Sequence, residues 1–176
     1  MWRLAHHRLS LGINTRHWST SAPTCPHCDV LETYEHFLDC PITTAGLDYV
    51  SSLWTRAGQH PLPLRTLDDL LFSVLSNRRA RTPRTRKNQL LRSVLVGEAL
   101  YAVYTARCRS IFDPNPPPFN KHTVLPILQH RLLHLLKTHQ HIKKIFSSSL
   151  VSTLLSLLPH SPTLTLQTLP NQRGSS

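Results

Sequence analysis

Apolar residues recur at intervals of three and four through most of the chain, which is the spacing of an amphipathic helix. In the first such segment they are Leu47, Val50, Leu53 and Trp54. The segments predicted to be helical are 43–57, 66–76, 86–112, 121–147 and 149–158. Almost no stretch has the alternating pattern of a β-strand. The sequence therefore predicts a mainly α fold.

Helix-ending and helix-starting residues set the bounds of these segments. Gly58 is a suitable residue to follow the first helix, and Thr66 with two early acids suits the start of the second. The sequence DPNPPP (113–118) separates the two long helices. After the last helix the chain is rich in Ser, Thr, Leu and Pro, so we expect a disordered tail up to residue 176.

The chain is strongly basic, which indicates the kind of partner that it binds. Twenty Lys and Arg stand against nine Asp and Glu, with a net charge of +11 and a pI of about 10.3. Such a balance favours a polyanionic partner. The apolar stretch SLVSTLLSLL is about half of the ~20 residues that a membrane-spanning helix needs. Residues 1–12 have no secretory signal pattern, so we expect an intracellular, nuclear protein with reduced thiols.

Three of the four cysteines lie in CPHCDVLETYEHFLDCP, residues 25–41. Cys25 and Cys28 are spaced to meet one metal ion, and His36 and Cys40 are four apart, on one face of a short helix. Together they make a Cys3His set, which closes the four-ligand shell of structural zinc. His27 is a rival ligand, but it sits inside the loop between the first two cysteines.

Other residues near these ligands are interpreted as structural. Glu32 and Glu35 are expected to be surface charges at a helix N-terminus. Cys108 is isolated in the sequence and is expected to be a small core residue. His130 and His134 could form a metal pair on a helix, but no third ligand is near, so we expect them to face solvent.

The densest basic stretch covers residues 78–92 and contains no acid. We expect it to form a loop that leads into the long helix and to contact phosphates, for which arginine is well suited. Its basic residues are Arg78, Arg79, Arg81, Arg84, Arg86, Lys87 and Arg92. No RNA-binding aromatic motif is present, so base-specific readout is not implied. Trp54, Tyr101 and Tyr104 lie at helical core spacing and are expected in the core.

No catalytic centre is expected in the chain. Asp68 and Asp69 are the only adjacent acids, and they lie at the start of a predicted helix rather than on the hairpin that a polymerase uses to hold two metal ions. No Gly-rich phosphate loop or G-x-S-x-G motif is present.

The segment CPHC…ETYEHFLDCP resembles the zinc-binding region that follows the polymerase domain in LINE-type (non-LTR) retrotransposon reverse transcriptases. HHRLSLGINTRHW resembles the approach to the first cysteine, and GEALYAVYTARCRSIF (97–112) resembles a helix that follows the zinc segment in many fungal and plant members. The family usually has four residues between the histidine and the last cysteine, whereas this chain has three. The pattern is already helical near Met1, so we expect a longer protein upstream.

These observations predict three regions: a zinc-binding segment (1–42), a helical domain (43–147) and a short helix with a disordered tail (148–176). The resemblance implies a non-catalytic module that binds RNA or DNA by backbone charge, beside a polymerase domain in cis or in trans. One alternative is a protein-interaction module in which zinc shapes the helical surface. Another is a relic reading frame of a transposable element.

Overall fold

The computed structural model describes residues 11, 24–62, 82–141 and 146–159. Within these residues the protein is mainly α, as predicted. Its helices are α3 (Tyr34–Asp39), α4 (Pro41–Arg56), α6 (Pro83–Phe112), α7 (Lys121–His141) and α8 (Ser148–Leu157). The predicted helix at 66–76 and the predicted disordered tail after residue 159 lie outside the described residues.

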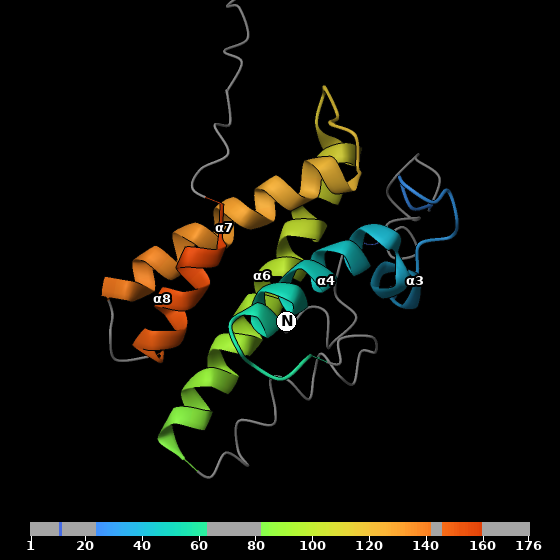
Figure 1. Ribbon diagram of the computed structural model, residues 1–176. Helices are drawn as coiled ribbons and strands as arrows, with labels where there is room; N and C mark the ends of the chain where they lie inside the picture. The colour runs from blue at the N-terminus through green and yellow to red at the C-terminus, as the bar shows by residue number, and fades with distance from the viewer. Residues whose placement is uncertain (1–10, 12–23, 63–81, 142–145, 160–176) are drawn as a thin grey trace, which may run out of the picture.

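Three helices, α4, α6 and α7, pack against one another and form the core. Figure 1 shows α4 and α7 lying across the long helix α6, with α8 against α7 at one side and α3 at the other. Each helix contributes a stripe of apolar residues, which the regular spacing in the sequence anticipated. On α7 the stripe is Val124, Leu128, Leu132 and Leu136, all almost fully buried.

Small residues allow α4 and α6 to approach closely. Gly46 of α4 lies where an added Cβ would come within 3.3 Å of Val103 Cγ2 on α6. On α6, Ala99, Ala102 and Ala106 are buried as well. The short side chains bring the two helix backbones together, and this sets where the N-terminal end of α4 lies relative to α6.

The ends of the helices follow from local chemistry. Gly58, at φ 74°, follows α4, and its N–H donates to Thr55 O (2.9 Å) while Gln59 N–H donates to Trp54 O (3.2 Å). This is the hydrogen-bond pattern of a Schellman motif, so the predicted role of Gly58 is confirmed. Asn120 caps α7, since its Oδ1 accepts from Thr123 N–H at 3.0 Å.

The long helix α6 begins earlier than predicted. Pro83 is its first residue rather than a loop residue, which suits proline because the first helical N–H needs no partner within the helix. The basic residues from Arg84 to Arg92 therefore lie on the helix and not in a loop. The other long helix, α7, is described as far as His141, and residues 142–145 lie outside the described part.

Two core predictions are wrong. Tyr101 is 53% exposed, because its position on α6 faces out beside α7 and not toward α4. The Arg131 guanidinium of α7 lies over its ring, 4.4 Å from the centroid. Cys108 is only partly buried. Trp54, by contrast, is buried as predicted, and Tyr104 is partly buried against the core.

Candidate metal centre

A tight turn places Cys25 and Cys28. Thr24 and Leu31 form an isolated antiparallel bridge that closes the turn at its base. Cys25 N–H donates to Val30 O (2.8 Å), and Asp29 N–H donates to Cys25 O (2.9 Å). Asp29 has φ 55°, a left-handed conformation that aspartate tolerates better than most residues. The turn brings the two thiols to the same side of the chain.

The short helix α3 places the other two residues. Thr33 caps it, since its Oγ1 accepts from His36 N–H at 3.1 Å. Cys40 N–H donates to His36 O at 2.7 Å, so these residues lie one helical turn apart, as their spacing predicted. Pro41 then begins α4, and the residue before a proline is held in an extended conformation. Cys40 is therefore fixed at the junction of two helices.

The four side chains meet at one point. The ligand atoms of Cys25, Cys28, His36 and Cys40 all lie within 4.8 Å of one another, and the group could hold a metal ion. Cys40 Sγ is 3.9 Å from Cys25 Sγ and 3.9 Å from Cys28 Sγ. Tetrahedral zinc with bonds of about 2.3 Å separates its sulfur ligands by about 3.8 Å, whereas a disulfide needs about 2.0 Å. The spacing is that of ligands to a shared metal ion.

An orphaned atom in the cluster also fits a metal. His36 Nε2 is buried and has no hydrogen-bond partner among the described residues. A buried ring nitrogen without a partner is costly. A metal ion bound in the cluster would provide that partner. The donor set of three sulfurs and one nitrogen is typical of structural zinc.

The three thiols of the cluster differ in pKa. The hydrogen bond from Cys40 lowers the pKa of Cys25 to about 4, and the same hydrogen bond raises the pKa of Cys40. Burial, together with the nearby Cys25 charge, raises the pKa of Cys28. Without metal, the cluster therefore holds one thiolate and two thiols at neutral pH. It is already biased toward the charged form that binds metal.

For the residues beside the cluster, the structure confirms some of the predicted exposures and contradicts one. His27, the rival ligand, is exposed and is not a member of the group. Glu35 is exposed, as predicted. The prediction that Glu32 is a surface charge is wrong: it is 1% exposed and forms an ion pair with the equally buried Arg107 of α6.

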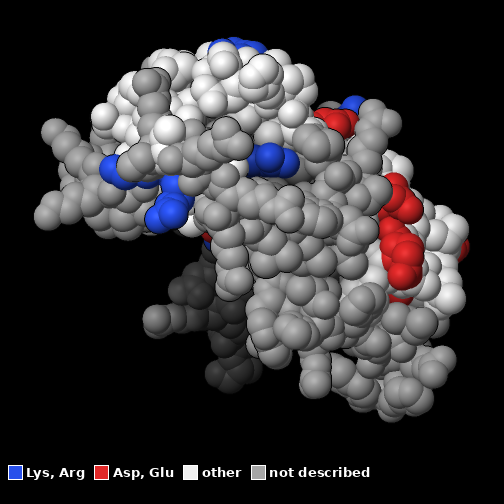
Figure 2. All heavy atoms as spheres, turned by 90° about the horizontal axis from the view of Figure 1, so that it is seen from below, with Lys and Arg blue, Asp and Glu red and all other residues white. Residues whose placement is uncertain are grey.

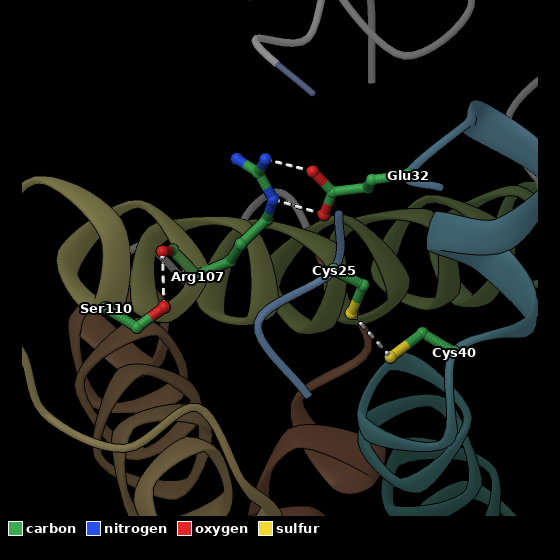
Figure 3. Close-up of polar contacts among 5 residues, drawn as sticks. All are labelled: Cys25, Glu32, Cys40, Arg107 and Ser110. Carbon is green, nitrogen blue, oxygen red and sulfur yellow. Dashed lines mark hydrogen bonds and ion pairs between the residues drawn. The ribbon is translucent and has the colours of Figure 1, made fainter. Parts of the chain in front are cut away.

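The Glu32–Arg107 pair joins the metal segment, residues 25–41, to the core. Figure 3 shows the guanidinium facing the carboxylate, with Arg107 Nε and Nη2 each donating to one carboxylate oxygen. Arg107 O also accepts from Ser110 Oγ at 2.7 Å. A signal for this pair does exist in the sequence. Arg107 lies four residues after Val103 and seven after Leu100, on the apolar face of α6, where an arginine requires a partner.

The predicted phosphate-contacting residues are described only in part. Arg78, Arg79 and Arg81 lie outside the described residues, as does the side chain of Arg84. Arg86 is exposed on the first turns of α6, and Lys87 and Arg92 are partly buried. The structure thus places the described part of the stretch on a helix beside the end of α4. The paired acids Asp68 and Asp69 also lie outside the described residues.

Charge is segregated along the chain and over the surface. No Lys or Arg occurs from residue 17 to residue 55, and that segment has four exposed acids: Asp29, Glu35, Asp39 and Asp48. Between Asp69 and Glu98 the chain has seven basic residues and no acid. On the face seen in Figure 2, red side chains gather on one side and blue ones toward the other. The metal segment is therefore the acidic part of a basic protein.

Among the described residues, the histidine pair of α7 does not belong to a group that could hold a metal ion. His130 and His134 are exposed, as predicted, and line a shallow hollow with Glu98 and Arg131. Among the described residues, the Cys3His cluster is the one group of three or more side chains that could hold a metal. No helix in the described part of the chain is long and apolar enough to cross a membrane.

The chain matches no protein-family model, no curated protein and no solved structure. The geometry of the cluster and the helical fold are therefore the basis for a functional proposal.

Proposed function

We propose that the protein is a non-catalytic, zinc-binding helical module that binds nucleic acid through the phosphate backbone. The convergence of Cys25, Cys28, His36 and Cys40 within 4.8 Å carries the zinc part of this proposal. Four protein ligands leave no coordination position for water, so the zinc is structural and supplies folding energy. It holds the turn at 25–31 against the start of α4.

Charge segregation supports the nucleic-acid part. The metal segment is acidic, and three thiolates with one Zn²⁺ would add a further negative charge, so phosphates are repelled there. The region between Asp69 and Glu98 has the opposite character, with seven positive charges and no acid. Arg86 presents its guanidinium at the surface of α6 within this region. The polyanion therefore binds at the N-terminal part of α6 and not on the zinc.

The resemblance to the C-terminal region of LINE-type reverse transcriptases is supported by how the similar segments meet. One is the metal segment at 25–41, and the other is the helix at 97–112. Glu32 comes from the first and Arg107 from the second, and they form the buried ion pair. In this proposal the module lies beside a polymerase domain, in cis or in trans, and holds template RNA or target DNA for it.

Salt dependence of binding tests the proposal. Affinity for a mixed-sequence single-stranded RNA or duplex DNA should fall with salt, with a log–log slope of about −0.7 to −0.9 per phosphate neutralised. The variant R78Q/R79Q/R84Q/R86Q should flatten the slope by about three units. A matched variant replaces four exposed basic residues elsewhere, R56Q/R109Q/K121Q/K137Q. If the two variants behave alike, the localised surface is refuted and general basicity remains.

A protein-interaction module is the second candidate, and exposed apolar side chains favour it. Val30 and Leu31 are about half exposed on the turn beside the metal cluster, and Tyr101 is equally exposed on α6 under Arg131. Tyrosine and arginine are enriched in the residues that dominate protein interfaces. This candidate predicts no salt-dependent binding of RNA or DNA, so the same titration separates the two functions.

A further inference from the structure

The turn beside the metal cluster exposes two apolar side chains that are neighbours in the sequence. Val30 is 47% exposed and Leu31 is 53% exposed. Among the described residues only two other large apolar side chains are exposed to this extent, Tyr101 and Phe112, and they lie eleven positions apart on α6. Scattered apolar residues are ordinary on a protein surface, whereas adjacent ones form a patch that a partner can cover.

The backbone of this turn is already held in place. Val30 O accepts from Cys25 N–H at 2.8 Å, and Leu31 O accepts from Thr33 N–H at 3.2 Å. Cys25 also belongs to the metal cluster, which holds the turn against α3. The turn therefore offers its two apolar side chains on a fixed frame, and a surface that is ordered before binding loses little entropy when a partner docks.

Acidic side chains lie beside the patch. Asp29 directly precedes Val30, and Asp39 is the last residue of α3; both are exposed. Their sequence neighbours Cys28 and Cys40 meet in the cluster, with the two Sγ atoms 3.9 Å apart, so both acids lie close to it. Neither acid forms an ion pair with another described residue. Figure 2 shows the acidic side chains gathered on one side of the face in view.

This charge selects the kind of molecule that covers the patch. No Lys or Arg occurs from residue 17 to residue 55, and three thiolates with one Zn²⁺ would add to the negative charge of the acids. The phosphates of nucleic acids and of lipids are therefore repelled. Two copies of this chain, each with a net charge of +11, repel one another as well. A basic segment of another protein is attracted.

We propose that Val30 and Leu31, with Asp29 and Asp39 beside them, form a docking surface for a basic segment of a partner protein that carries an apolar anchor. An apolar centre with a charged rim is the ordinary anatomy of a protein interface. The surface goes beyond the proposed nucleic-acid binding and does not depend on it. With both activities, the module would hold a protein at its metal segment and a polyanion at the N-terminal part of α6.

Two synthetic peptides of equal length and equal charge are the probes, one made of lysine and leucine and the other of lysine and serine. The full-length, zinc-loaded protein should bind the leucine peptide more tightly, as measured by fluorescence anisotropy. The variant V30T/L31T should weaken this binding at least about tenfold, because both apolar contacts are lost. Asp29→Asn should weaken it by up to about fivefold, the range of an exposed ion pair. Asparagine also tolerates the left-handed conformation of this position.

Matched variants at distant positions separate the docking surface from general effects. Y101Q/F112Q removes two apolar side chains of similar exposure on α6, and Asp113→Asn removes an exposed acid that follows that helix. Both should keep the affinity of the wild type for the leucine peptide. Zinc content and far-UV circular dichroism report whether each variant folds. In NMR spectra the leucine peptide should shift the amide resonances of Val30 and Leu31 more than that of Arg86.

Four results would overturn the docking surface. One is equal binding of the leucine and serine peptides, and another is an equal loss of binding in V30T/L31T and Y101Q/F112Q. Self-association of the wild type that V30T/L31T abolishes, measured by analytical ultracentrifugation, would identify a second copy as the occupant. Weaker RNA binding by V30T/L31T would identify nucleic acid as the occupant. Loss of the salt-dependent RNA binding alone would refute the proposed function and leave selective peptide binding as support for this surface.

Discussion

Glu32 and Arg107, 75 positions apart in the sequence, form an ion pair with both side chains buried. Each carboxylate oxygen accepts one hydrogen bond from the guanidinium, a bidentate arrangement that only arginine among the basic residues offers. The pair joins the metal segment to the C-terminal part of α6, and both side chains are buried, so water cannot replace a missing partner. The pair therefore matters for stability mainly because the loss of one partner leaves the other buried and unsatisfied.

Removing one partner of this pair should destabilise the protein strongly. Arg107→Met or Glu32→Gln leaves the other group buried and unsatisfied, so each should lower the free energy of unfolding by about 3–5 kcal/mol. The double variant E32L/R107M, which buries apolar groups instead, should recover much of this loss. Urea denaturation measures all three.

The exposed pair Glu98–Arg131 provides the control for that series. Its side chains are 21% and 36% exposed, so water compensates when the pair is broken. Glu98→Gln should therefore cost about 1 kcal/mol or less. A similar cost for Glu98→Gln and Glu32→Gln would contradict the structural role assigned to the buried pair.

Among the four cysteines, only the three in the cluster should determine the zinc content. The purified protein should carry about one zinc ion, and Cys28→Ser should remove it because the four-ligand shell is then open. Cys108→Ser is the matched control, since Cys108 lies outside the cluster, and it should retain the metal. Chelation should also unfold the metal segment, because closing such sites supplies about 10 kcal/mol in zinc-finger peptides. Equal zinc in both variants, measured by elemental analysis, would refute the site.

Proton release should accompany zinc binding. The pKa of Cys25 is lowered to about 4, so its proton is already lost at neutral pH, whereas the raised pKa values of Cys28 and Cys40 keep their protons on. Zinc uptake should release about two protons, and affinity should fall about a hundredfold for each pH unit lowered near neutral pH. A pH indicator in weakly buffered solution measures the release. Release of three protons would mean that Cys25 is a thiol in the metal-free protein.

The helices and the ligand set could be predicted from local sequence, because both depend on short spacings. Two residues separate Cys25 from Cys28 in a tight turn, and His36 and Cys40 are one helical turn apart, so the meeting of the four side chains needs little of the rest of the chain. The burial of Glu32 could not be predicted in this way. An acid before a short helix is ordinarily a surface charge, and only the packing of α6 brings Arg107 against it.

Tyr101 is the reverse case, a residue that was predicted to be buried and is exposed. Its aromatic ring suggested the core, but the helix α6 turns it outward, and Arg131 of α7 covers one face of the ring instead.

The three-residue spacing between His36 and Cys40 leads to the last prediction. The structure accommodates it, since Cys40 closes α3 with its N–H on His36 O and then starts α4 at Pro41. Inserting a leucine after Leu38 would restore the usual spacing of LINE-type reverse transcriptases but rotate Cys40 by about 100° about the helix axis. It would also shift α4, whose Gly46 contacts α6 closely.

We therefore expect the insertion to weaken zinc binding and to lower the thermal stability of the protein. Competition with a chromophoric chelator gives the zinc affinity, and a leucine inserted after Gln59, beyond the end of α4, is the control for insertion itself. Tighter zinc binding after the insertion at Leu38 would show that the present spacing is a defect and that the arrangement of α3 and α4 must be revised. An unchanged affinity would remove Cys40 from the ligand set.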